Sequence, residues 1–281
     1  MTSRVLKPMP KTLHAIAIPI YQKALSTQEL FSIKNAVSIL SRHDVYFVGP
    51  THLAEFLIEL TAQFERSVYV QTFEDRYFGS IDGYNRLMLS SLFYEAFQDY
   101  QYILISQTDS LVFRDELDEW AKKAYSYIGA PWFEGFTQPT MPLQLSAVGN
   151  GGFSLRNVQD FLRVLNQPRI FKNVLMDSWP GNILSTCYRY VKDYRSFLYK
   201  NTQINLNVNE DLFWGLFVSP RCAFFDVPNP REAVAFAFEA HPEYSYALNN
   251  NQLPFGCHAW ARYNPAFWNR VFEQHRLLNP Q

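Results

Sequence analysis

Residues 102–110, YILISQTDS, join a short apolar run to a polar end that carries an aspartate. A continuous apolar run of this length is typical of a strand that is buried on both faces, as in a parallel sheet. Ligands of such sheets bind beyond the carboxyl ends of the strands. We therefore expect Asp109 and Ser110 to lie at a ligand-binding edge, where a carboxylate can bind a hard divalent cation or hydrogen-bond the amides of a turn.

Strand-like and helix-like segments alternate on the N-terminal side of this stretch. The strand-like segments are 13–21, 44–48 and 68–72, and the helix-like segments are 27–40, 53–64 and 84–97. Ser26 is a candidate N-cap for the first of these helices. The alternation predicts an α/β fold whose central sheet is mainly parallel and flanked by helices.

The chain of 281 residues shows no internal repeat or low-complexity linker. At about 150 residues per domain this length fits one large unit or two small ones. We expect a single domain over 1–281. Strand-like and helix-like segments alternate regularly in the first half, about 1–145, and less regularly in the second half, about 146–281.

Charge and composition exclude several classes of protein. The chain has 25 Lys and Arg against 26 Asp and Glu, so it carries no field that would hold nucleic acid. Because no long apolar stretch or export signal occurs, we expect a cytoplasmic protein without a transmembrane segment. Cys187, Cys222 and Cys257 are odd in number and far apart, which favours reduced thiols. Residues 188–200 form a basic amphipathic pattern that fits a solvated helix face better than contact with an anionic membrane surface.

Glycine is scarce, with 11 residues in the chain, yet Gly149, Gly151 and Gly152 fall within four positions around Asn150. Glycines let the backbone approach a ligand closely and adopt positive φ, although a plain turn would also use them. The sequences GxxxxGK[ST] and GxGxxG do not occur, which argues against a P-loop and a standard dinucleotide fold.

The second half holds an acidic pair and a late histidine. Glu210 and Asp211 follow Asn209 at the start of an apolar helix, where they could cap the helix or supply a general base. His258 could be a core histidine or a metal ligand. Trp132 and Trp260 could stack on sugar rings or fill the core.

The order of these features resembles the common core of type A (GT-A) glycosyltransferases. The segments that carry the resemblance are QTDS (107–110), GAPW (129–132), VGNGGFSLR (148–156), NEDLFW (209–214) and FGCHAW (255–260). They look like a family of bacterial-type glycosyltransferases of unassigned specificity. The resemblance covers nearly the whole chain.

The resemblance implies a role for each segment. Asp109 would occupy the metal-binding DxD position, and His258 would be the second ligand of Mn²⁺ or Mg²⁺. Glu210 and Asp211 would form the xED motif, with Asp211 as general base and Glu210 as a sugar or acceptor contact. Pro19 and Tyr21, together with Ser110, would bind the nucleotide, while Trp132, Trp260 and the 149–152 loop would contact the sugar or acceptor. The DxD position reads Asp-Ser-Leu and lacks the second carboxylate.

The expected activity is transfer of a sugar from a nucleotide-sugar donor to a glycan, lipid-linked or protein acceptor. The transfer is expected to be inverting and metal-assisted, as in polysaccharide biosynthesis, with the first half binding the donor and the second half the acceptor. Peripheral contact with the inner face of a membrane would fit such an acceptor. Two other functions remain open: a catalytically silent sugar-nucleotide binding module, and a sugar nucleotidyltransferase, for which an early phosphate-binding loop is lacking.

Overall fold

The computed structural model of the chain describes residues 12–136, 139, 141–166 and 209–275. Cys187 and the helix expected over 188–200 lie outside these residues. Cys222 and Cys257 are both free and buried, as expected of reduced thiols. None of the helices in the described part of the chain is long and apolar enough to cross a lipid bilayer.

A six-stranded sheet forms the centre of the molecule, with strand order β3-β2-β1-β4-β9-β6. The first four strands in this order run parallel, and β9 runs antiparallel to both of its neighbours. The strands are β1 (His14–Pro19), β2 (Asp44–Pro50), β3 (Val68–Phe73), β4 (Tyr102–Ser106), β6 (Tyr127–Ile128) and β9 (Phe153–Asn157). The predicted mainly parallel sheet is confirmed.

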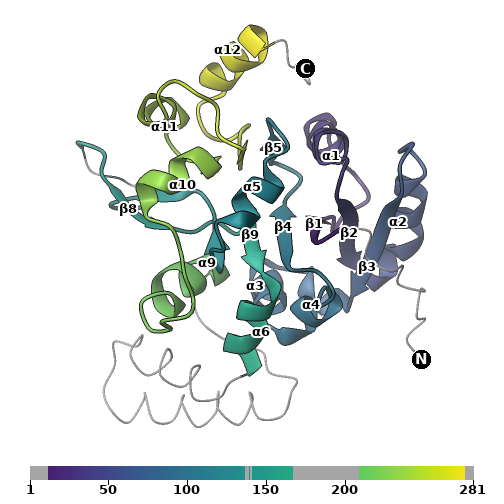
Figure 1. Ribbon diagram of the computed structural model, residues 1–281. Coiled ribbons are helices and arrows are strands. Elements are labelled where there is room, and N and C mark those ends of the chain that lie inside the picture. Colours follow the sequence, from purple (N-terminus) through teal and green to yellow (C-terminus); the bar gives the residue numbers. More distant parts are fainter. Residues whose placement is uncertain (1–11, 137–138, 140, 167–208, 276–281) are drawn as a thin grey trace.

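Helices cover both faces of this sheet (Figure 1). Side chains alternate along a strand, so Ile16 and Ile18 of β1 pack on one face while Ala15 and Ala17 pack on the other. The first face is covered by α1 (Thr27–Ile39), α2 (Ala54–Thr61), α5 (Leu117–Lys122) and α10 (Pro230–Phe236). The second face is covered by α3 (Ile81–Met88), α4 (Ser91–Ala96), α6 (Val158–Asn166) and the π-helical segment η3 (Phe213–Val218). Burial of both faces explains the continuous apolar runs of the strands.

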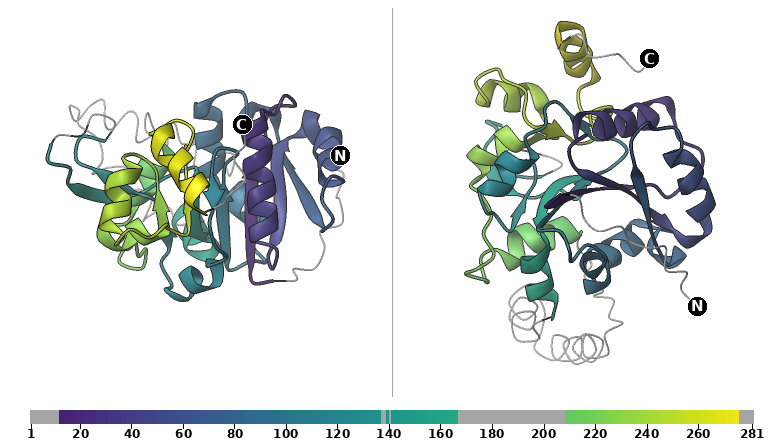
Figure 2. Two further views of the ribbon diagram at one scale, coloured as in Figure 1. Left: turned by 90° about the horizontal axis from the view of Figure 1, so that it is seen from above. Right: turned by 45° about the vertical axis from the view of Figure 1, so that its right-hand side comes forward.

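Smaller elements join the C-terminal part of the chain to this core. A three-stranded sheet holds β10 (Ala237–Phe238), β11 (Gly256–Cys257) and β5 (Leu111–Val112), and a hairpin holds β7 (Pro131–Phe133) and β8 (Leu145–Val148). The remaining helices of the described residues are η1 (Thr51–Leu53), η2 (Asp75–Tyr77), α9 (Glu210–Leu212), α11 (Pro242–Leu248) and α12 (Pro265–His275). Both views of Figure 2 place α12 beside α1, where Phe31 contacts Phe272 with ring centroids 6.4 Å apart. Because β11 pairs antiparallel with β5, the residues that follow β11 lie beside the residues that precede β5.

Most of the predicted elements are confirmed, and one is wrong. Ser26 caps α1 in a full capping box with Glu29, as its position predicts. The single helix expected over 84–97 is instead two helices, α3 and α4, which are separated at Ser90. Ser90 has extended backbone angles, and its hydroxyl donates to the carbonyl of Leu87 at 2.8 Å. A side chain that bonds to a nearby carbonyl in this way competes with the helical ladder.

Candidate active site

A cavity of about 590 Å³ opens where the carboxyl ends of β1 and β4 meet the loop between β8 and β9. Seven of the residues selected from the sequence line it, namely Tyr21, Asn150, Gly151, Gly152, Glu210, Asp211 and His258. The other lining residues are Phe78, Gly79, Ser80, Ile81, Tyr84, Asn85, Gln107, Asn209, Glu239 and Arg262. The cavity therefore lies at the sheet edge where ligands of α/β proteins bind.

His258 lies between two carboxylates at this edge. Its Nδ1 atom is 2.8 Å from Oε1 of Glu239, and its Nε2 atom is 3.2 Å from Oδ1 of Asp109. The chain brings the three together because Asp109 follows β4, Glu239 follows β10 and His258 follows β11. The Nε2 atom is buried and makes no hydrogen bond. With Nδ1 donating to Glu239, Nε2 faces the Asp109 carboxylate and becomes an electron-pair donor once it loses its proton.

The charges of this cluster are strongly coupled. Burial disfavours the charged imidazole, but the contacts with Asp109 and Glu239 outweigh it and raise the pKa of His258 to about 10. Burial likewise opposes ionisation of Asp109, but the contact with His258 and the charge of Arg262 hold the pKa of Asp109 below its usual value. Asp109 is therefore ionised at neutral pH and available as an oxygen ligand.

Asp109 and His258 fit a divalent cation whose coordination sphere is completed by a substrate. A histidine whose second nitrogen is held by a carboxylate is the usual arrangement for a metal ligand. Asp109, with a side chain 48% exposed, offers the hard oxygen that Mg²⁺ and Mn²⁺ prefer. Within the described ranges no group of three or more His, Cys, Asp or Glu could hold a metal ion. Two protein ligands alone would need phosphate oxygens and water to fill the coordination sphere.

The glycines of the 149–152 loop are required by close packing and not by positive φ. In the described part of the chain, Gly135 is the one glycine with positive φ, so the conformational role expected of Gly149, Gly151 and Gly152 is wrong. A Cβ on Gly149 would lie 2.0 Å from the ring of Trp132. A Cβ on Gly151 would lie 2.7 Å from Oε1 of Glu210. Each of these two glycines thus makes room for a neighbouring side chain.

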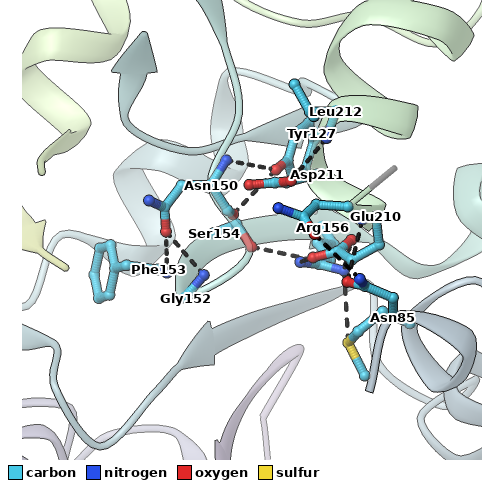
Figure 3. A network of polar contacts seen from close by, with 12 residues as sticks. Asn85, Tyr127, Asn150, Gly152, Phe153, Ser154, Arg156, Glu210, Asp211 and Leu212 are labelled. Carbon is cyan, nitrogen blue, oxygen red and sulfur yellow. Dashed lines mark hydrogen bonds and ion pairs between the residues drawn. The ribbon is translucent and has the colours of Figure 1, made fainter. Parts of the chain in front are cut away.

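Asn150 holds the loop in place. Its Oδ1 accepts hydrogen bonds from the backbone amides of Gly152 at 2.8 Å and Phe153 at 2.7 Å (Figure 3). Its own backbone amide donates to the hydroxyl of Tyr127, which donates in turn to the Asn150 carbonyl. Its Nδ2 lies 3.2 Å from Nδ1 of His258. With Oδ1 occupied in this way, Asn150 is built into the wall of the cavity.

The two acids of the second half have different surroundings, as Figure 3 shows. The Glu210 carboxylate is buried and forms a bidentate ion pair with Arg156, with N–O distances of 2.8 and 3.0 Å. Asp211 is partly buried, and its Oδ1 accepts from the Leu212 amide at 2.8 Å. Burial, with the nearby charge of Glu210 as a further cause, raises the pKa of Asp211 to about 7. A carboxylate with such a pKa can accept a proton at neutral pH.

Six predicted site residues do not line the cavity: Asp109 and Gly149, which neighbour the lining residues His258 and Asn150, and the four residues that follow. Pro19 ends β1 and is buried, and Ser110 is buried with its hydroxyl donating to the carbonyl of Gly152. Trp132 packs on Gly149, with its ring centroid 5.6 Å from that of Phe136. Trp260 is 5% exposed, and its indole nitrogen donates to the Ser32 hydroxyl. The structure thus places Pro19, Ser110, Trp132 and Trp260 behind the cavity wall or in the core.

Residues 67–258 match the family described as "protein of unknown function", DUF5672. The chain belongs to this family. The match spans the Asp109 strand end, the glycine loop, the acidic pair and His258. No match was found among the curated proteins.

Solved structures show which fold this DUF5672 member has. It is similar to the galactosyltransferase LgtC in complex with donor and acceptor sugar analogs, with 13% identity, 92% of this chain and 94% of that chain covered, and a TM-score of 0.51. An active-site mutant of LgtC matches with 14% identity, the same coverage and a TM-score of 0.50. Mouse xyloside xylosyltransferase 1 matches with 8% identity, 87% and 96% coverage, and a TM-score of 0.48. The two LgtC matches show that the chain has the GT-A fold, as the resemblance implied.

Several residues of this DUF5672 cavity were not selected from the sequence. They are Tyr84 and Asn85 on α3, Gln107 after β4, Glu239 after β10 and Arg262 after β11. Gln107 and Glu239 each follow an apolar strand, which is a signal that the sequence does offer. Tyr84 and Asn85 lie on an ordinary amphipathic helix, and nothing in its pattern distinguishes residues that face a cavity from residues that face the core.

Proposed function

We propose that the chain is a glycosyltransferase that transfers a sugar from a nucleotide-sugar donor to an acceptor hydroxyl, with inversion at the anomeric carbon. The observation that carries the proposal is that one cavity is lined by both Asp211 and His258. Asp211 has a pKa of about 7, and His258 contacts Asp109. The GT-A fold supports the proposal as a fold-level analogy.

Asp211 is the general base in this proposal. Its carboxylate removes the proton of the acceptor hydroxyl while the hydroxyl oxygen bonds to the anomeric carbon. The bond from that carbon to the diphosphate oxygen breaks, and the diphosphate leaves with the electron pair. A base whose pKa lies near the working pH combines a useful ionised fraction with a useful driving force for proton transfer.

Asp109 and His258 are the residues that would hold a divalent cation, through Oδ1 and Nε2. A bound Mn²⁺ or Mg²⁺ would neutralise charge on the departing diphosphate. Glu239 keeps His258 oriented by accepting from Nδ1. Arg262 lines the same cavity, and its guanidinium is suited to bind the negatively charged diphosphate. This contact would support diphosphate binding at a DxD position that has a single aspartate to hold the cation.

Tyr21 is the residue best placed to contact the nucleotide base. It follows β1, lines the cavity and is 52% exposed. Burial, together with the charges of Asp109 and Glu29, raises the pKa of its phenol, so the ring keeps its proton and offers a neutral face for stacking. In this arrangement residues 1–145 form the donor side and residues 146–281 the acceptor side, with a glycan, a lipid-linked sugar or a protein as acceptor.

The test is incubation of the protein with a panel of nucleotide sugars, with Mn²⁺ and with chelator, followed by measurement of hydrolysis and transfer. The product's anomeric configuration, read by NMR, checks inversion. A parallel reaction with nucleoside triphosphate and sugar phosphate would reveal a nucleotidyltransferase by pyrophosphate release. Binding that ignores chelator and is never followed by turnover would identify a silent binding module and contradict the proposal.

A further inference from the structure

Arg156 is a fully buried cation next to the candidate active site. It lies on β9 with a relative exposure of 0%, and its partner Glu210 is 2% exposed. Nη1 is 3.0 Å from Oε2 of Glu210, and Nη2 is 2.8 Å from Oε1. This side-by-side geometry is the strongest form of an Arg–carboxylate pair and fixes the direction of both groups.

The orientation of the guanidinium is set from the side of the sheet. Its Nε donates to the hydroxyl of Ser154 at 3.0 Å, and Nη1 donates to the hydroxyl of Tyr94 at 3.0 Å. Burial opposes the charge of Arg156, but Glu210 outweighs it, so the pKa of the guanidinium is raised well above its usual value. Arg156 is therefore a fixed positive charge at every pH of interest.

Glu210 has little capacity left for a ligand. Both of its oxygens accept hydrogen bonds from Arg156. Oε1 also packs against Gly151, where a Cβ atom would lie 2.7 Å from it. Its backbone amide donates to Oδ1 of Asn85 at 3.3 Å, and Nδ2 of Asn85 donates to Oδ1 of Asn209. The carboxylate and the backbone of Glu210 are thus each anchored to a different element.

Asp211 is the next residue of α9, so anchoring Glu210 also fixes the backbone that presents Asp211. The charged and titratable groups around Asp211 come from several elements: Glu210 of α9, Arg156 of β9, Tyr127 of β6 and Glu239 after β10. After burial, the negative charge of Glu210 is the largest influence on its protonation, and Arg156 acts in the opposite direction. The ion pair therefore controls both the position and the charge environment of Asp211.

We infer that Arg156 is a positioning residue that acts through Glu210, and that Glu210 anchors Asp211 at the cavity instead of contacting the sugar or acceptor. This assignment rests on the proposed function of Asp211 as a base. It replaces the role that the resemblance implied for Glu210.

The test compares Arg156→Met, Glu210→Gln and the double variant in transfer assays over a range of pH. Arg156→Met leaves a buried carboxylate uncompensated, so we expect kcat to fall at least about 10-fold and the acid limb of its pH profile to move upward by about one pH unit. Glu210→Gln should move the limb downward. The double variant should return the limb close to its original pH and regain part of the lost kcat.

Two further variants separate the contributions. Arg156→Lys keeps the charge without the bidentate geometry, so kcat should fall while the acid limb stays in place. Lys123→Met removes a cation from another ion pair, 2.7 Å from Glu232, and should leave kcat and the limb unchanged. If circular dichroism shows that Arg156→Met does not fold, Arg156→Lys is compared with Glu210→Gln in its place.

A titration of the Asp211 carboxyl carbon by NMR gives a readout that does not depend on activity. The same shifts are expected in the variants even if no nucleotide sugar is turned over, which would contradict the proposed function alone. The inference is overturned if Asp211 titrates identically in all variants. It is also overturned if Glu210→Gln raises the donor or acceptor KM by the same factor in the original protein and in the Arg156→Met variant. Glu210 would then contact the ligand itself.

Discussion

A Cβ atom on Gly152 would lie 2.0 Å from Nε2 of His258, a distance at which no side chain could be accommodated without a shift. The carbonyl of the same glycine accepts from the amide of Gln107 at 2.8 Å and from the hydroxyl of Ser110 at 3.1 Å. Gly152 therefore lies between the end of β4 and the histidine that follows β11. The absence of a side chain there lets Asp109 and His258 come into contact.

Gly152→Ala should displace the His258 imidazole and weaken Mn²⁺ binding by about 10-fold or more, since the orientation of a ligand determines its affinity. Isothermal titration with Mn²⁺ measures the effect. Gly79→Ala is the matched control, because Gly79 also lines the cavity but a Cβ there has no atom within 4 Å. Equal Mn²⁺ affinities for the two variants would show that His258 is not a ligand.

The rate of sugar transfer should depend on the ionisation of Asp211. Only the carboxylate form accepts a proton, so kcat should rise as pH increases through about 7 and level off above it. Asp211→Asn should lower kcat by about 10²–10⁴-fold and remove this limb, while donor affinity measured by calorimetry stays the same. Unchanged kcat in Asp211→Asn would exclude Asp211 as the base.

The same pKa makes a prediction about stability. Burial raises the pKa of Asp211 to about 7, so the folded state favours the protonated acid. The stabilisation from this preference is present below the pKa of the unfolded chain, near 3.8, and is lost as pH rises through about 7. The free energy of unfolding of Asp211→Asn should therefore be higher than that of the original protein at pH 8 and similar to it at pH 4. Urea denaturation at both pH values measures the difference, and a gain at pH 4 alone would contradict it.

Glu239→Gln should weaken Mn²⁺ binding by about 10–100-fold, because the carboxylate that accepts from Nδ1 fixes the tautomer and direction of His258. The Mn²⁺ dependence of donor binding provides the measurement. Glu232→Gln, which also removes a carboxylate from an ion pair, serves as the control. An unchanged metal affinity in Glu239→Gln would contradict this orienting role of Glu239.

Trp260→Ala should reduce stability and leave ligand binding intact. The Trp260 side chain packs in the core, with its ring centroid 5.3 Å from that of Phe272, and does not line the cavity. Removing a buried Trp costs about 3–5 kcal/mol of unfolding free energy. Thermal melts and nucleotide-sugar titrations at a temperature where the variant is folded test this. A loss of sugar-nucleotide affinity with an unchanged melting temperature would restore the stacking role.

Much of the fold is predictable because local patterns are strong here. The apolar run before Asp109, the capping box at Ser26 and the alternation of strands and helices are each set by residues close together in the sequence. The prediction of one helix over 84–97 is wrong at Ser90, where a side-chain hydrogen bond to the backbone interrupts an otherwise continuous apolar spacing.

The cavity follows less directly, since its residues come from strand ends that the sheet brings together. Asp109, Asp211 and His258 carry chemical types that stand out in the sequence, whereas Tyr84 and Asn85 do not. The sequence presents Glu210 and Asp211 as an acidic pair at the start of a helix and does not separate their surroundings. Only the tertiary structure places the fully buried Arg156 against Glu210 and leaves Asp211 facing the cavity.

The sequence by itself determined the order of strands and helices and which residue types could carry chemistry, because periodicity and residue type are local properties. The tertiary structure decided which groups are neutralised and which remain available. Burial and pairing depend on contacts between distant segments: Gly152 leaves room for His258, and Arg156 neutralises the charge of Glu210.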